Sequence, residues 1–123
     1  MTLKERFKLW LPAMIWMVII FFISGQPINN PGVAFSWLDF IFKKTGHLTE
    51  YAILYGLIFR AVSQKGKFTY KKIFMTAFVL GLIYALTDEW HQTFVTGREG
   101  TLRDVGFDSL GMLAGLIITR NWL

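Results

Sequence analysis

The chain of 123 residues contains no cysteine, three prolines, and eight acidic residues against 13 basic ones. Without cysteine, a disulfide scaffold, a thiol nucleophile, a cysteine zinc site and lipidation through a cysteine are all excluded. Charged residues make up 17% of the chain, hydrophobic residues make up 54%, and the mean hydropathy is +0.44. The surface of a soluble domain of this size needs more polar groups than these. The composition therefore predicts a membrane protein with a single domain, residues 1–123.

Four apolar blocks predict an all-α bundle of four transmembrane helices. The first block has Pro12 near its start, where a helix tolerates proline, and no small-residue cleavage site follows it, so we expect a retained spanning helix. The other blocks are shorter than a membrane crossing needs. Tilt of the helix, or an Arg60 side chain that reaches the headgroup level, would make up the missing length. A soluble bundle is the alternative, but the blocks are apolar all round. The expected helices cover about residues 9–24, 47–64, 72–94 and 104–120.

The segment between the first two predicted helices, residues 32–44, is apolar but too short to cross a membrane. Its Trp37 is a residue type that favours the level of the lipid headgroups. We therefore expect a short interfacial segment, lying along the membrane surface, between helices one and two.

Basic residues gather on one predicted side of the bundle. The segment between the second and third helices holds Lys65, Lys67, Lys71 and Lys72 and no acid, and both chain ends are also basic. Because lysine and arginine stay in the cytoplasm, we expect a multi-pass protein with both termini cytoplasmic. The net charge of +5 is then a consequence of topology, with membrane lipids as partners and no nucleic acid.

The opposite side gathers nearly all the acidic residues and both histidines. Three helix ends, distant in sequence, bring these side chains to one depth, and the spacing of His47, Glu50 and Tyr51 puts them on one helix face. Ionisable groups at such depth usually face the interior of a bundle or a wet cavity. The outward-facing polar cluster that we predict comprises His47, Glu50, Tyr51, Asp88, Glu89, His91, Gln92, Arg98, Arg103, Asp104 and Asp108.

Gly111 and Gly115 form a small-residue pattern on the fourth predicted helix. Such a pattern lets another helix approach closely. We favour packing inside the monomer, and the alternative is a homo-oligomer formed through the same two glycines.

The sequence contains the motifs Lys44-x-x-His47-x-x-x-Tyr51, Asp88-Glu89-x-x-Gln92-x-Phe94-x-x-Gly97-Arg98, Asp104-x-x-x-Asp108-x-x-Gly111 and Ser24-Gly25-Gln26-Pro27. Together they resemble the VanZ-like family of small bacterial membrane proteins, and the resemblance covers nearly the whole chain. It implies an integral protein of the bacterial plasma membrane, in a family whose founding member is associated with low-level resistance to teicoplanin, a lipoglycopeptide antibiotic.

Four functions of the cluster stay open. A metal site would use His47, Glu50, Asp88 and His91, although nothing fixes the distance between the two pairs. A hydrolase or transferase acting on a lipid-linked substrate would use two acids of different pKa. A purely structural cluster would lock the helix ends together through ion pairs.

We favour the fourth function, which is binding or shielding of an amphiphilic envelope ligand, such as a lipid-linked wall intermediate or a glycopeptide. Buried acids, arginine and interfacial aromatics are the mixture that such recognition needs. On this hypothesis we expect no metal and no cofactor, and whether the protein is an enzyme stays open.

Overall fold

The computed structural model of the chain describes residues 2–24, 37–63, 69–94 and 102–120, and these residues form four α-helices and no β-strand. The all-α expectation is confirmed for this part of the chain. Within the helices, the side chains of nine residues lie outside the description: Ser24, Trp37, Asp39, Phe40, Phe42, Lys43, Leu102, Arg103 and Asp104. The helices are α1 (Leu3–Ser24), α2 (Trp37–Ser63), α3 (Tyr70–Gln92) and α4 (Leu102–Thr119).

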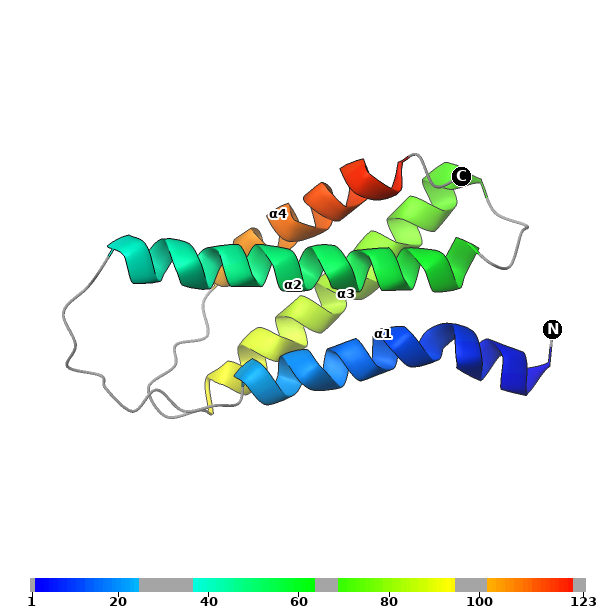
Figure 1. Cartoon of the computed structure of the whole chain (residues 1–123), viewed down its shortest axis with the longest axis horizontal. Helices are drawn as coiled ribbons and strands as arrows, with labels where there is room; N and C mark the ends of the chain where they lie inside the picture. Colours follow the sequence, from blue (N-terminus) through cyan, green and yellow to red (C-terminus); the bar gives the residue numbers. More distant parts are fainter. Residues whose placement is uncertain (1, 25–36, 64–68, 95–101, 121–123) are drawn as a thin grey trace.

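The two ends of the bundle differ in charge. The start of α1, the end of α2, the start of α3 and the end of α4 lie at the same end, on the right in Figure 1. We call this end the basic end, since its described charged residues are Lys4, Glu5, Arg6, Lys8, Arg60, Lys71, Lys72 and Arg120. We call the opposite end the polar end, because His47, Glu50, Asp88, Glu89, His91 and Asp108 belong to the helix segments there.

α1 begins at Leu3 and not near residue 9, because its first turn is capped. The Thr2 backbone N–H donates to Glu5 Oε2 (3.1 Å), and the Glu5 backbone N–H donates to Thr2 Oγ1 (3.2 Å). This reciprocal capping box satisfies two backbone groups that a helix start otherwise leaves without partners. Pro12 therefore lies inside α1 and not near its start.

α2 is one continuous helix from Trp37 to Ser63, so the expectation of a separate interfacial segment is wrong for residues 37–44. These residues form the first turns of α2, and residues 32–36 lie outside the described part. The expected boundary stood at Gly46, but a glycine inside a helix costs only about 1 kcal/mol and does not end it. The Thr49 hydroxyl donates to the Thr45 backbone oxygen (2.8 Å), a contact that spans Gly46 within the helix.

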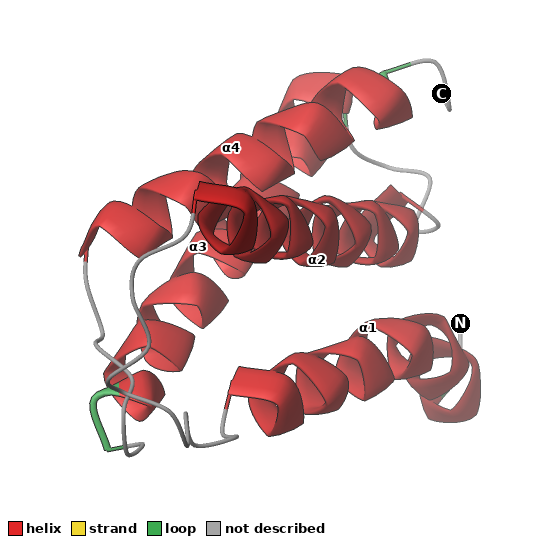
Figure 2. Cartoon of the chain, turned by 60° about the vertical axis from the view of Figure 1, so that its left-hand side comes forward, coloured by secondary structure: helices red, strands yellow, loops and turns green. Residues whose placement is uncertain are grey.

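α2 is the central helix and packs against each of the other three. In both Figure 1 and Figure 2, α1 and α4 lie on opposite sides of it. Its buried face carries large aromatic side chains at Tyr51, Tyr55 and Phe59, which recur at every fourth position. The facing helices supply small residues, and this pairing of bulky with small side chains lets helices pack closely in a membrane. The buried residues of α3 include Ile73, Ala77, Gly81 and Ala85.

Gly111 and Gly115 face α2 of the same chain. A Cβ built on Gly111 would lie 2.5 Å from the Leu48 backbone oxygen, and one built on Gly115 would lie 3.0 Å from the Ala52 backbone oxygen. The pattern is therefore used for packing inside the monomer, as favoured above. Association of two copies through these glycines stays a prediction.

Large apolar side chains are exposed on all four helices, which is unusual for a monomeric soluble protein. α1 and α3 are each long and apolar enough to cross a membrane, with candidate spans Leu3–Ile23 and Tyr70–Gln92. The apolar helix Val105–Thr119 is shorter, and α2 carries charged residues at both ends. Two helices of the described residues thus meet the length and composition of a span.

Candidate functional site

Two polar pairs occupy the polar end, between α2 and its neighbours α3 and α4. The first pair joins α2 to α4, because His47 Nδ1 lies 3.1 Å from Asp108 Oδ1. The Asp108 side chain is 0% exposed and that of His47 is 20% exposed. The contact is an ion pair when the ring is protonated and a hydrogen bond when it is neutral. Gly111, one turn after Asp108, allows the close helix approach on which this contact depends.

The second polar contact joins α2 to α3. The Tyr51 hydroxyl donates to Asp88 Oδ2 at 3.4 Å, and Gln92 Nε2 donates to the same oxygen at 3.5 Å. Both distances are long for hydrogen bonds. All three side chains are at most 3% exposed, so the contacts form in a region without room for bulk water. Tyr51 also lies within electrostatic range of Asp108, which makes it the link between the two pairs.

Glu50 lines a hollow of about 440 Å³ between α1 and α2. Its backbone oxygen accepts a hydrogen bond from Trp16 Nε1 of α1 (2.9 Å). The lining is mostly apolar, and its polar residues are Thr45, Thr49 and Glu50. We call this site the outer hollow. Its lining residues are Trp16, Leu38, Ile41, Thr45, Gly46, Thr49, Glu50 and Ile53.

The described contact of His91 is with α1. The His91 ring stacks on Phe21 of α1, with ring centroids 3.9 Å apart and planes 18° from parallel. Glu89 is 6% exposed. Within the described residues no three histidine or acidic side chains are close enough to hold a metal ion. The described side chains of His47, Glu50, Asp88 and His91 therefore do not gather into one group in this arrangement.

Three predicted cluster residues cannot be placed against these pairs. Arg98 lies outside the described residues. Arg103 and Asp104 belong to the first turn of α4, at the polar end, and their side chains lie outside the description. Their pairing with other cluster residues stays a prediction.

Tyr84, which helical spacing places on the same face of α3 as Asp88, also belongs to this end. Tyr84 donates its hydroxyl to the Met17 backbone oxygen and so ties α3 to α1, and its ring lies 6.4 Å from that of Tyr51. Its position one turn before Asp88 is the sequence signal for it. Trp16 and the threonines of the outer hollow gave no such signal, because only the packing of α1 on α2 makes them neighbours of Glu50.

The sequence profile of the VanZ/LLP1 family matches residues 9–123. This match confirms the resemblance derived from the motifs. No curated protein and no solved structure matches the chain. The matched range includes all four polar helix ends described above.

Proposed function

The chain belongs to the VanZ/LLP1 family, and from this premise we propose that it binds an amphiphilic ligand of the bacterial cell envelope in the outer hollow. The protein is a membrane protein, as the family and the two candidate spans indicate. The head group of the ligand lies beside Glu50, and its acyl chain lies along the apolar wall. The observation that carries this proposal is the mixed lining of the outer hollow.

The volume and lining of the outer hollow suit an amphiphile. Its volume of about 440 Å³ falls in the range of about 300–1,000 Å³ that small-molecule sites occupy. Ile41 and Ile53 offer apolar surface to an acyl chain, while Thr45, Thr49 and Glu50 offer hydrogen-bonding groups. Such a site orients a ligand by its head and holds it by its tail.

The charge of the outer hollow favours particular head groups. A carboxylate accepts hydrogen bonds and attracts cations, and threonine hydroxyls both donate and accept. Glu50 and the two threonines therefore suit a head rich in hydroxyl and ammonium groups better than a bare phosphate. A lipoglycopeptide such as teicoplanin has this chemistry, and so do the sugar and amino groups of a lipid-linked wall intermediate.

The buried contacts of the cluster position the site. Asp88 and Asp108 are at most 2% exposed, so a ligand in the outer hollow does not touch them. Through Tyr51 and His47 they hold the polar ends of α2, α3 and α4 in register. His91 holds α1 through its ring stack on Phe21. We further propose that Glu89, Arg98, Arg103 and Asp104 complete this polar end.

The proposed topology places the site at the outer surface of the plasma membrane. All four helices cross the membrane, both termini are cytoplasmic, and the basic end faces the cytoplasm. The gathering of basic residues at one end of the bundle supports this orientation. A ligand of the cell wall or an antibiotic from outside would then reach the outer hollow without crossing the membrane.

Teicoplanin itself, with and without its acyl chain, is the probe that tests this function. We expect the protein in lipid nanodiscs to bind the acylated form more tightly. Glu50→Gln keeps the size of the side chain and removes its charge, and it should weaken binding about tenfold, since a hydrogen bond to a charged group contributes ~1.5–3 kcal/mol. The recovered teicoplanin should have an unchanged mass, and loss of its acyl chain would instead indicate a hydrolase.

Glu5→Gln is the matched control, because Glu5 is an exposed acid at the basic end and glutamine can keep its capping contact. It should bind teicoplanin like the wild type. Equal weakening by Glu5→Gln and Glu50→Gln, or no weakening by either, would contradict a site at Glu50. Equal binding of the two forms of teicoplanin would contradict the role of the acyl chain.

A further inference from the structure

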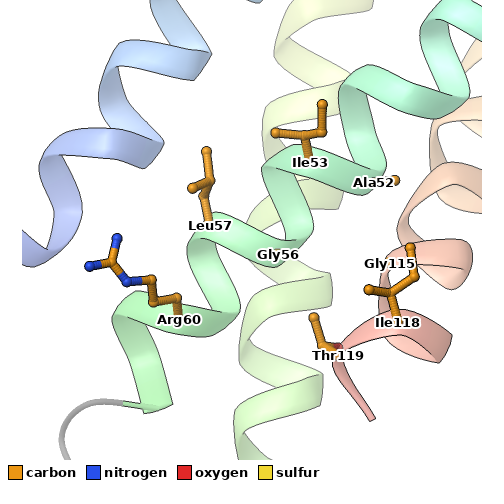
Figure 3. A pocket seen from close by; sticks show the side chains of 8 residues that line it. All are labelled: Ala52, Ile53, Gly56, Leu57, Arg60, Gly115, Ile118 and Thr119. Atoms are coloured by element: carbon orange, nitrogen blue, oxygen red, sulfur yellow. The ribbon is translucent and has the colours of Figure 1, made fainter. Parts of the chain in front are cut away.

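A second groove lies on the opposite half of α2, between α2 and the end of α4, with a volume of about 280 Å³. Figure 3 shows Ile53 and Leu57 of α2 on one side of it, Ile118 and Thr119 of α4 on the other, and the bare backbone at Gly56 between them. We call it the inner groove. Its lining residues are Ala52, Ile53, Gly56, Leu57, Arg60, Gly115, Ile118 and Thr119.

The inner groove has the length and the lining of a site for an acyl chain. Ala52 and Arg60 are eight residues apart on α2, which corresponds to about 12 Å at 1.5 Å per residue. One leaflet of the hydrocarbon core is about 15 Å thick. Apart from Arg60 and Thr119, the lining is apolar. Ile53 also lines the outer hollow, so the two sites meet at this residue of α2.

Arg60 gives the inner groove a positive charge at the end nearest the basic end. Its side chain is exposed, and it makes no ion pair within the described residues. Lys71 and Lys72, in the first turn of α3, add charge of the same sign at that end. An arginine offers phosphate two parallel hydrogen bonds, and its long stem lets the guanidinium reach the headgroup level while the groove stays in the hydrocarbon.

We propose that the inner groove binds one acyl chain of an anionic phospholipid from the leaflet at the basic end, with the lipid phosphate on Arg60. This lipid site is independent of the outer hollow, because it has the opposite charge and lies in the other half of the bundle. The bound lipid covers the otherwise open backbone at Gly56 and fills the space between α2 and α4. The proposed lipid site requires that the protein lies in a membrane, but it does not require a ligand in the outer hollow.

Native mass spectrometry of the protein in mild detergent tests the lipid site, with phosphatidylglycerol and phosphatidylcholine of identical acyl chains as probes. We expect one phosphatidylglycerol to be retained per chain in preference to phosphatidylcholine. Arg60→Gln should reduce this preference about fivefold, as expected for one basic residue at an anionic lipid surface. Ile118→Trp, at a side chain that is 59% exposed, should fill the groove and lower the retention of both lipids.

Arg6→Gln is the matched control, since Arg6 is an exposed arginine at the same end and does not line the groove. It should keep the wild-type preference. Equal loss in Arg6→Gln and Arg60→Gln would show general attraction to a basic surface and overturn the proposal. Unchanged retention in Ile118→Trp would also overturn it, and this variant decides the question if Arg60→Gln does not fold.

Discussion

At the scale of single residues, the polar end is unusual because its acids are buried in an apolar protein. Asp88 is 2% exposed and Asp108 is 0% exposed. A buried carboxylate is tolerated when hydrogen bonds and charges around it replace water. His47 does this for Asp108, while Tyr51 and Gln92 do it for Asp88. These side chains therefore stabilise the charge of the acids as much as the acids hold the helices.

His47→Ala should lower the thermal stability of the purified protein, because it removes the 3.1 Å contact to the buried Asp108. The expected cost is ~1.5–3 kcal/mol, the contribution of a hydrogen bond to a charged group. His91→Ala, which loses a ring stack on Phe21, should cost less, about 0.5–1.5 kcal/mol. In the background of Asp108→Asn the cost of His47→Ala should shrink, and a full, additive cost in that background would refute the coupling.

Asp88→Asn should weaken teicoplanin tolerance in cells while the protein stays in the membrane. The change preserves shape but weakens the contact from Tyr51, which joins α2 to α3 at the polar end, and the contact from Gln92 within α3. Susceptibility to teicoplanin and protein abundance are measured in the same cells. Loss of the protein would mean that the charge of Asp88 serves folding alone, and unchanged tolerance at normal abundance would mean that Asp88 does not position the site.

At the scale of elements, α2 organises the molecule because its contacts with the other three helices are the most extensive. One face, with Tyr51, Tyr55 and Phe59, forms the core, and another face lines both the outer hollow and the inner groove. α4 comes close to α2 because Gly111 and Gly115 lie against α2 backbone oxygens. The distance between α2 and α4 thus depends on two residues without side chains.

Gly111→Ala should destabilise the protein, because the new Cβ would lie 2.5 Å from the Leu48 backbone oxygen and α4 would have to move. Overpacking of this kind typically costs about 1–3 kcal/mol. Gly106→Ala is the control, since nothing lies within 4 Å of its Cβ position. There alanine should stabilise the helix by about 0.5–1 kcal/mol. Thermal unfolding in detergent micelles measures both, and a stabilising effect at both positions would argue against the close contact.

At the scale of the whole molecule, charge separates the two ends of the bundle. The helix ends with Lys4, Arg6, Lys71 and Lys72 lie together, and the ends with the buried acids lie opposite. This separation is what orients a protein in a membrane, because basic segments resist translocation. Because of this separation of charge, we propose different ligands at the two ends of α2. A ligand head group with ammonium or hydroxyl groups lies beside Glu50, and a lipid phosphate lies on Arg60.

The absence of cysteine makes the orientation directly testable, since any introduced cysteine is the sole labelling site. On intact cells, a membrane-impermeant maleimide should label Thr93→Cys, at the polar end. It should label Lys71→Cys, at the basic end, only after the membrane is opened. Both positions are exposed at helix ends, so access to the reagent depends on the side of the membrane. The reverse pattern would invert the topology and place the outer hollow in the cytoplasm.

Much of the fold was predictable from the sequence. The composition indicated a membrane protein, the apolar blocks indicated helices, and the motifs from Lys44 to Gly111 indicated the family that the profile confirms. The start of α1 was missed although the capping box of Thr2 and Glu5 was visible in the sequence. The continuity of α2 was missed because a glycine after two lysines looks like a boundary, whereas helix packing outweighs one weak residue.

The sequence by itself determined which residues lie at the polar end, because helical spacing and the order of the blocks fix depth. Tertiary structure decided which of them meet. Asp108 contacts His47 and Asp88 contacts Tyr51, although all four belong to the same end of the bundle. The outer hollow and the inner groove were equally absent from the pattern, since each is lined by residues of two helices that only their packing brings together. The periodicity of a helix defines its faces, but only the packing of side chains determines which neighbour each face receives.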